Sequence, residues 1–115
     1  FQSQRLLISI SIHDRSRVMR LTESFYQDET LRLAPQLLGK RLVRMTQAGR
    51  MAGYIVEVEA YAWRDDPACH ANRGQTPRNS VMFGRPGLLY VYSIHAKYCM
   101  NVVTEREGRG AAILI

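Results

Sequence analysis

The run of residues 55–61, with the sequence IVEVEAY, constrains the fold of this chain most, because it sets two carboxylates inside the apolar pattern of a strand. Side chains alternate between the two faces of a strand. The pattern therefore predicts that Glu57, Glu59 and Tyr61 share one face. A buried carboxylate without a partner is costly. Two interpretations stay open on this pattern alone: the shared face is exposed, as on many antiparallel strands, or it lines a site.

The size and charge of the chain favour one small domain that binds a polyanion. The chain has 115 residues, of which 46% are hydrophobic, enough for a packed core. Its formal net charge is +6, and 14 of its 16 basic residues are arginines. The planar fork of donors on arginine suits phosphate oxygens. Nucleic acid is therefore a candidate partner, although many basic proteins bind none.

The cysteines and the hydropathy pattern exclude several classes of protein. Cys69 and Cys99 form no Cys-x-x-Cys pair, so neither a zinc ribbon nor a disulfide framework is predicted. Two reduced cysteines are typical of a reducing compartment, which predicts the cytoplasm. No apolar run reaches the ~18 residues of a membrane-spanning helix. We expect no membrane partner.

The two ends predict a partial domain with an upstream extension. Residues 6–12 have the alternation of a short strand, but a solvated run follows at 13–17. Met19 is a candidate start, so we interpret residues 1–18 as an extension and residues 19–115 as the domain. The apolar run at 111–115 is typical of a strand inside a sheet. We expect a domain that is incomplete at its C-terminus.

The rest of the pattern predicts an α+β fold, in which small helices flank a curved, mostly antiparallel sheet. A short helix is expected at 22–27. A second is expected to begin near Ala34, because Pro35 is tolerated only in a first helical turn, and to end at Gly39. Strands are expected at 40–46, 51–61, 88–95, 98–104 and 111–115, the first two joined by a hairpin turn at 47–50.

A long irregular segment at 62–87 separates the strands and is expected to be functional. It holds three of the four prolines and three of the eight glycines. The Asp66-Pro67 pair is typical of a helix start. We therefore predict a short helix that carries Cys69 and His70.

Six short motifs, in order, resemble the alkyladenine (3-methyladenine) DNA glycosylase family of base-excision repair. Each motif alone is weakly specific, but the ordered set is highly specific, and the resemblance runs from about Phe25 to Ile115. The motifs are VEAY at 58–61, ACH at 68–70, QTPRN at 75–79, MF at 82–83, PGLLYVY at 86–92 and CMN at 99–101.

The resemblance implies an enzyme that flips an alkylated or deaminated purine out of double-stranded DNA and into a pocket. It implies that Tyr61, His70, Tyr92 and Asn101 form this pocket. Aromatic rings replace the lost base stacking and favour a positively charged purine. Asn101 would disfavour guanine by crowding its exocyclic amine. Ordinary core packing remains the alternative for the tyrosines, and a surface position remains the alternative for His70.

The resemblance also implies that Glu59 is the catalytic carboxylate. A carboxylate at this position accepts a proton from the attacking water and stabilises the oxocarbenium-like sugar. Glu57 is interpreted as structural or salt-bridged. Lys97 is the only lysine near these motifs, so a Schiff-base lyase step is not favoured. We expect monofunctional hydrolysis without a cofactor, and the spacing of the cysteines and histidines does not favour a metal site.

Four residues are predicted to contact DNA. Arg78 and Asn79 lie in a loop that suits phosphate contacts, unless the loop is simply stabilised by its own arginine. His95 stands where the family commonly has a tyrosine that fills the gap left by the flipped nucleotide, and Tyr98 is the other candidate for this role. The family arginine that holds the catalytic water is expected after Ile115.

The expected partner is double-stranded DNA with damaged purines, bound by a monomer in the bacterial cytoplasm near the nucleoid. The full-length protein is expected to be the enzyme, and the present chain to be weak or inactive. Two other interpretations remain. One is a basic nucleic-acid-binding relative without catalysis, and the other is an unrelated small α+β protein with surface carboxylates.

Overall fold

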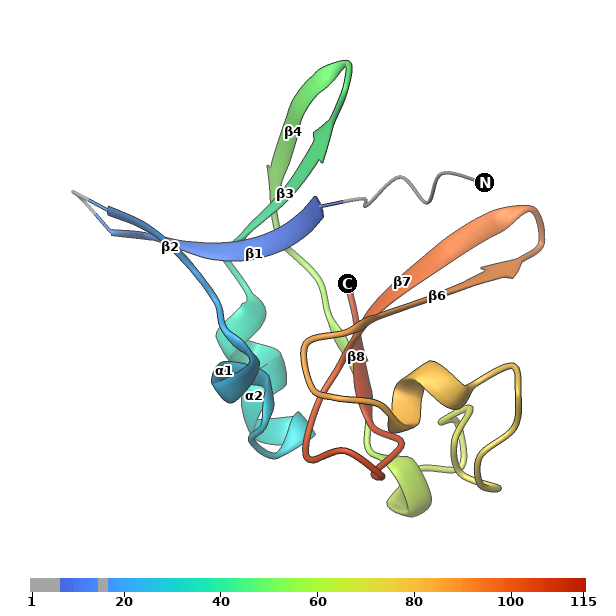
Figure 1. Ribbon diagram of the computed structural model, residues 1–115. Coiled ribbons are helices and arrows are strands. Elements are labelled where there is room, and N and C mark those ends of the chain that lie inside the picture. The colour runs from blue at the N-terminus through green and yellow to red at the C-terminus, as the bar shows by residue number, and fades with distance from the viewer. Residues whose placement is uncertain (1–6, 15–16) are drawn as a thin grey trace.

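The computed structural model describes residues 7–14 and 17–115, which form two four-stranded sheets and two short α-helices (Figure 1). Every strand pairing within the described residues is antiparallel. The α+β prediction is confirmed, but the chain builds two sheets where one curved sheet was expected. The strand orders are β2-β1-β3-β4 and β5-β8-β7-β6.

The elements follow one another along the chain in two groups. The first sheet contains β1 (Leu7–Asp14), β2 (Arg17–Arg20), β3 (Arg41–Thr46) and β4 (Gly49–Tyr54). The second contains β5 (Glu59–Tyr61), β6 (Leu89–Ile94), β7 (Lys97–Val103) and β8 (Ala112–Leu114). Between β2 and β3 lie α1 (Glu23–Tyr26) and α2 (Thr30–Leu37).

The strand expected at 6–12 is present as β1, which lies between β2 and β3. Ile10 of β1 is buried in the same apolar cluster as the helices. Residues 1–6 and 15–16 lie outside the described residues, and they include the start of the predicted extension and part of the predicted solvated run. The predicted boundary at Met19 falls inside β2, and the division of the chain there stays a prediction.

The prediction that the second helix begins near Ala34 is wrong, because α2 begins at Thr30 and contains Pro35. Proline in a helix removes the hydrogen bond to the carbonyl four residues earlier, here that of Leu31. Both residues lie on the exposed side of this short helix, where water can satisfy the carbonyl. The buried side consists of Thr30, Leu33, Ala34 and Leu37. Gly39, with φ +79°, follows the helix end as predicted.

The prediction of one continuous strand through 51–61 is also wrong. β4 ends at Tyr54 and β5 begins at Glu59, and the residues between them connect the two sheets. Ile55 is held at the end of α2 by two backbone hydrogen bonds, from Gly39 N–H to its carbonyl and from its own N–H to the Lys40 carbonyl, each 2.8 Å. Its side chain enters the core with Val58 and Ala60, so the expected alternation breaks at this bend.

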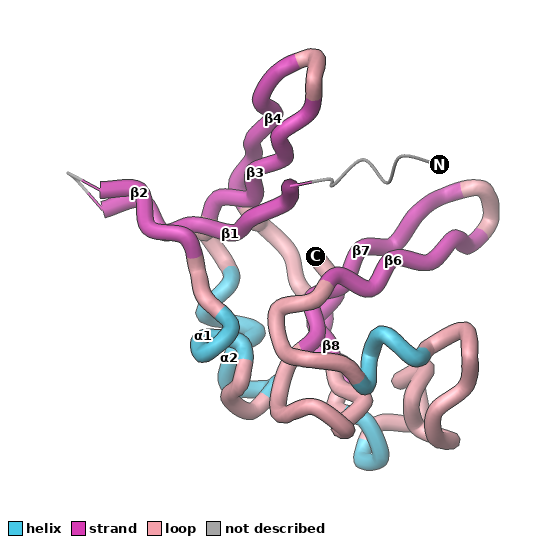
Figure 2. The backbone as a smooth tube through the Cα atoms, viewed as in Figure 1, coloured by secondary structure: helices cyan, strands magenta, loops and turns pink. Residues whose placement is uncertain are grey.

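The second sheet has two faces, which differ in what covers them. One face, which we call the helix face, packs into the apolar cluster of α1, α2 and β1 through Ala60, Val102 and Ile113. The opposite face is covered by residues 62–87, and we call it the loop face (Figure 2). It carries Glu59 and Tyr61 of β5, Ala112 of β8, Cys99, Asn101 and Val103 of β7, and Tyr90 and Tyr92 of β6.

Residues 62–87 are irregular, as predicted, apart from the 3₁₀ helices η1 (Trp63–Asp65) and η2 (Ser80–Phe83). The predicted helix at Asp66 is wrong. The Asp66 carboxylate instead accepts the Ala68 N–H at 2.9 Å and closes a tight turn. Single turns follow as far as Gly74, so His70 lies on a turn. In the part of the chain that the structure describes, no helix has the length and apolar character needed to cross a membrane.

Candidate active site

A small pocket lies between the loop face and residues 62–87. Its volume is about 30 Å³, close to the share of one water molecule in the liquid. All four residues predicted to form the base pocket line it. The lining residues are Tyr61, Ala68, His70, Met82, Tyr90, Tyr92 and Asn101.

The register of the second sheet brings these residues together from distant parts of the sequence. Glu59 pairs with Leu114, Leu114 pairs with Asn101, and Asn101 pairs with Tyr90. These four positions therefore form one row across the loop face, because directly opposed residues project to the same side. Tyr61 and Tyr92 lie two residues further along their strands, on the same face. The pocket is thus built on rigid strands and closed by the loop.

Three aromatic rings form the wall of the pocket. The ring centroids of His70 and Tyr92 are 4.5 Å apart, and those of Tyr90 and Tyr92 are 5.5 Å apart. His70 Nδ1 lies 3.3 Å from the Tyr90 hydroxyl, within hydrogen-bond distance. Burial raises the pKa of Tyr90, although the nearby Arg78 guanidinium opposes this, and burial also raises the pKa of Tyr92. Both phenols are therefore neutral hydrogen-bonding groups at neutral pH.

Glu59 is exposed and does not itself line the pocket, but it lies at the rim, bonded to the lining residue Tyr61. The Tyr61 hydroxyl donates a hydrogen bond of 2.6 Å to Glu59 Oε2. This hydrogen bond is the main cause of the raised pKa of Tyr61, so Tyr61 stays a donor at neutral pH. Glu59 lines an open groove of about 250 Å³, together with Glu57 and Tyr98. The carboxylate is thus bonded to a ring of the aromatic pocket and borders a space that admits water.

Glu57 and Asn101 differ in their exposure and in their hydrogen bonds. Glu57 is exposed, and no ion pair involves it within residues 7–14 and 17–115. The Asn101 side chain is almost completely buried, and its Nδ2 donates to the Tyr90 carbonyl at 3.2 Å. This hydrogen bond fixes the plane of the Asn101 amide at the floor of the pocket.

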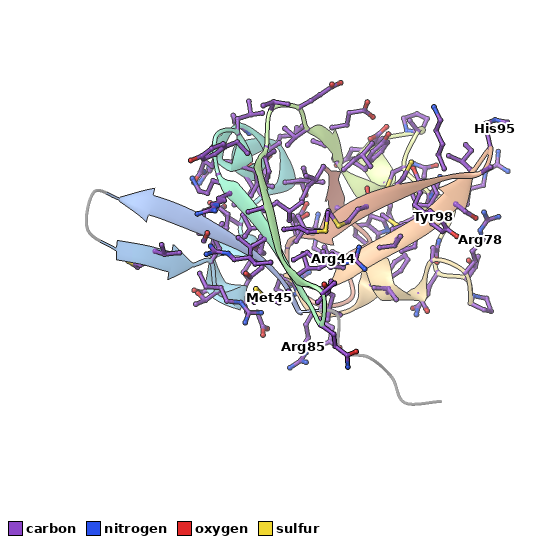
Figure 3. The ribbon with its side chains drawn as sticks, turned by 90° about the horizontal axis from the view of Figure 1, so that it is seen from above. Arg44, Met45, Arg78, Arg85, His95 and Tyr98 are labelled. Atoms are coloured by element: carbon purple, nitrogen blue, oxygen red, sulfur yellow. The ribbon has the colours of Figure 1, made fainter. Side chains whose placement is uncertain are left out.

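The residues predicted to contact DNA have different positions. Arg78 is exposed, and Figure 3 shows it on the same side of the molecule as His95 and Tyr98. His95 and Ala96 have φ +48° and +60° and form the two-residue turn of the β6–β7 hairpin. Tyr98 is 80% exposed, on the opposite face of the hairpin from Tyr92.

Asn79 does not lie with these exposed residues. Its side chain is 4% exposed, and both its amide oxygen and its amide nitrogen bond to the loop. The structure therefore gives Asn79 an internal role in the loop, and a phosphate contact through this amide would require the loop to open.

Three residues that line the pocket were not predicted: Ala68, Met82 and Tyr90. Tyr90 shares a face with Tyr92 by simple alternation, so the period of β6 was a sufficient signal. Met82 lies in a motif of the resemblance, but its approach to the pocket depends on how residues 62–87 fold. Nothing in the local sequence indicates Ala68.

The two cysteines are free. Cys69 is buried, which raises the pKa of its thiol, and its sulfur lies 3.4 Å from the Gly110 carbonyl. Among the residues that the structure describes, no group of three or more His, Cys, Asp or Glu side chains is placed to hold a metal ion.

The sequence model of the methylpurine-DNA glycosylase (MPG) family matches residues 24–115. This chain belongs to that family. The predicted resemblance is thereby confirmed, and the pocket, the rim carboxylate and the β6–β7 hairpin all lie within the matched residues.

Curated relatives carry the same description. A protein of Methanocella arvoryzae described as "Putative 3-methyladenine DNA glycosylase" is 55% identical over 96 residues, which cover 83% of this chain and 48% of that protein. Similar proteins of Wolbachia pipientis and Legionella pneumophila, with the same description, are 54% and 50% identical. The matched residues cover 50% of the Wolbachia protein and 53% of the Legionella protein. The chain thus spans about half the length of these relatives.

Proposed function

We propose that this protein is a base-excision repair enzyme that hydrolyses the N-glycosidic bond of alkylated or deaminated purines in duplex DNA. The observation that carries the proposal is the hydrogen bond from Tyr61 to Glu59 at the mouth of an aromatic pocket. It combines an aromatic stacking surface with a carboxylate that, in this proposal, lies beside the sugar of an extruded nucleotide. The descriptions of the relatives name one such purine, 3-methyladenine.

The pocket supports binding of a flat, electron-poor base. Tyr61 on one side and His70 with Tyr92 on the other offer rings that can replace the stacking lost on flipping. The present volume admits about one water molecule, so a side chain must move before a purine enters. Asn101 presents a fixed amide at the floor, which we propose crowds the exocyclic amine of guanine and selects against it.

Glu59 supports the hydrolytic step. In this proposal a water molecule from the open groove attacks the sugar carbon C1′ while the bond to the purine nitrogen breaks. Glu59 accepts the proton of the water, and the base leaves with the electron pair of the broken bond. The negative charge of the carboxylate also stabilises the oxocarbenium-like sugar. No metal or cofactor is needed for this step, and Lys97, in the exposed hairpin, is not required.

The exposed face around the pocket supports contact with the duplex. Arg78 offers a charged donor to a phosphate, and its exposed position leaves it available. His95 at the hairpin tip and Tyr98 beside it are the side chains proposed to fill the gap in the duplex. Asn79 is left out of this set because its amide is used inside the loop.

The experiment that tests the proposal compares two neighbouring carboxylates. A duplex with one hypoxanthine is incubated with the full-length protein and then treated with alkali, which cuts the strand at an abasic site. Strand scission by the unmodified protein should fall by about 10²–10⁴-fold in Glu59→Gln. The matched control Glu57→Gln, exposed and two residues away, should retain scission. Equal scission by the Glu59→Gln variant would remove Glu59 from its role.

One observation favours a second function. Glu59 is exposed in this structure, as it would be in a relative that binds nucleic acid without catalysis. Such a protein would bind the same duplex with a steep dependence on salt. It would produce no alkali-sensitive site, and Glu59→Gln would change nothing. The scission assay therefore separates the two functions, whereas binding alone does not.

A further inference from the structure

One buried amide holds together the loop that covers the pocket. The Asn79 amide oxygen accepts the N–H of Thr76 at 2.7 Å, and its Nδ2 donates to the carbonyls of His70 and Gly74 at 3.0 and 3.1 Å. The backbone N–H of Asn79 lies 3.3 Å from Thr76 Oγ1. We call these four hydrogen bonds the Asn79 clasp.

The Asn79 clasp can form with few other side chains. An asparagine amide has two N–H donors on one nitrogen and an acceptor oxygen. Both donors meet carbonyls here, and the oxygen meets an N–H, so the amide is satisfied in one orientation. An aspartate in its place would direct a carboxylate oxygen at two carbonyls. Gly74, with φ +102°, allows the chain to turn back toward Asn79.

The clasp reaches the pocket through His70. Because His70 lies on a turn, no helix fixes its backbone. Its neighbours Cys69 and Ala71 are buried, and the backbone around them makes single turn hydrogen bonds. The hydrogen bond from the Asn79 side chain is made directly to the backbone carbonyl of His70. The His70 ring in turn lies 4.5 Å from the ring of Tyr92 and bonds to the Tyr90 hydroxyl. A shift of the His70 backbone would therefore open the aromatic wall.

We propose that Asn79 is a positioning residue of the base pocket, which holds the His70 backbone so that the imidazole stays against Tyr90 and Tyr92. This inference deepens the proposed function and rests on it for the meaning of the pocket. It assigns to Asn79 a role that does not involve contact with DNA.

The first test follows the imidazole itself. In the ¹H–¹³C spectrum of the protein, the His70 ring signal is assigned with a His70→Gln variant, and the nearby tyrosine rings should shift it away from that of exposed His95. His70 is itself partly open to solvent, so the ring shift from Tyr90 and Tyr92 is the readout. In Asn79→Ala and Asn79→Asp this shift should be lost, and the His70 signal should move toward that of His95. The control Ser80→Ala removes a hydrogen bond to the Pro77 carbonyl in the same loop and should leave the signal in place.

The second test uses excision of hypoxanthine. Asn79→Ala and His70→Ala should each lower single-turnover excision by about 10–10²-fold, since small misplacements of binding groups have effects of this size. The double variant should be no worse than either single variant, because both changes act through one side chain. A residue needed only for general stability would instead give additive losses and a lowered melting temperature.

The outcomes separate this inference from the proposed function. An unmoved His70 signal in a folded Asn79 variant, or additive losses, overturns the inference while the Glu59 result stands. Absence of excision by the unmodified protein overturns the proposed function, while the His70 signal still decides whether the clasp positions the ring. If Asn79→Ala does not fold, the milder Thr76→Val, which removes one acceptor of the clasp, decides by the same signal.

Discussion

The helix face and the loop face of the second sheet come from the same strands, yet their partners differ. On the helix face, Val102 and Ile113 are fully buried against Leu33 and Leu37 of α2. On the loop face, tyrosines, an asparagine and a rim carboxylate meet an irregular segment that has only two 3₁₀ helices. One face is regular and apolar, and the other is polar, aromatic and partly open.

This difference teaches how a small sheet can provide both a core and a site. Apolar burial of the helix face stabilises the fold without directional contacts. The loop face depends on directional hydrogen bonds such as those of Asn79 and Tyr61, which set geometry more than stability. Changes on the helix face should therefore affect the free energy of unfolding, and changes on the loop face should affect binding and chemistry.

The largest effect is expected from the core of the helix face. Leu37→Ala should lower the free energy of unfolding by about 2–5 kcal/mol, because the side chain is fully buried and leaves a cavity. Denaturant unfolding measures this change. The neighbouring Leu38 is exposed, so Leu38→Ala is the control and should cost much less. Equal losses from both variants would contradict the described position of α2.

A change on the loop face should mainly affect the enzyme reaction. Under the proposed function, Tyr92→Ala removes one stacking surface. The variant should lose about 1–3 kcal/mol of transition-state stabilisation, measured as a fall in kcat/KM for hypoxanthine excision. Single-turnover excision and denaturant unfolding are measured on the same sample. A loss of stability as large as that of Leu37→Ala, with normal excision by the folded protein, would break the distinction between the two faces.

The pH dependence of the free energy of unfolding tests whether Tyr26 of α1 is buried in the apolar cluster. Burial raises the pKa of Tyr26 to about 12, although Arg20 lowers it somewhat. Since the unfolded tyrosine titrates near 10, the folded state retains a proton that the unfolded state loses. The stability from this group is therefore fully present below pH 10 and falls by about 1 kcal/mol between pH 10 and 11.

Unfolding of the unmodified protein and of Tyr26→Phe, measured at pH 9, 10 and 11, isolates this contribution from that of the other tyrosines. The variant should show the smaller loss of stability above pH 10. Parallel curves for the two proteins would mean that Tyr26 is not buried as described.

The smallest effect is expected from the tyrosine on the other face of the same hairpin. Tyr98 is 80% exposed, so Tyr98→Ala should change the free energy of unfolding by less than about 0.5 kcal/mol. Together with Tyr92→Ala, this variant compares two tyrosines of one hairpin that differ in the face they occupy. Destabilisation by Tyr98→Ala larger than by Tyr92→Ala would show that the faces are assigned the wrong way round.

Much of the second sheet could be predicted from local pattern. Residues 88–95 and 98–104 alternate in the way that β6 and β7 require, and Gly39 follows a helix because its positive φ suits glycine. The predictions failed where distant contacts decided the backbone. Burial of Ile55 at the end of α2 bends the chain between β4 and β5, and apolar burial of α2 outweighs the local cost of Pro35.

The candidate site also contains residues that the sequence indicated and one role that it could not indicate. Motifs indicated Glu59, Tyr61, His70, Tyr92 and Asn101, and the structure brings all of them to one side of the second sheet. The internal role of Asn79 could not be predicted, since an exposed and a buried asparagine look identical in a sequence. Its role follows from carbonyls at positions 70 and 74, which only the folded loop brings within reach.

By itself, the sequence determined the family, because ordered carboxylate, tyrosine and asparagine motifs are visible without coordinates. It also determined the strands whose side chains alternate over several residues. Only the tertiary structure decided which face of the sheet became the core and which became the pocket. The reason is that register and loop closure are set by contacts between residues far apart in the chain, and local pattern does not specify those contacts.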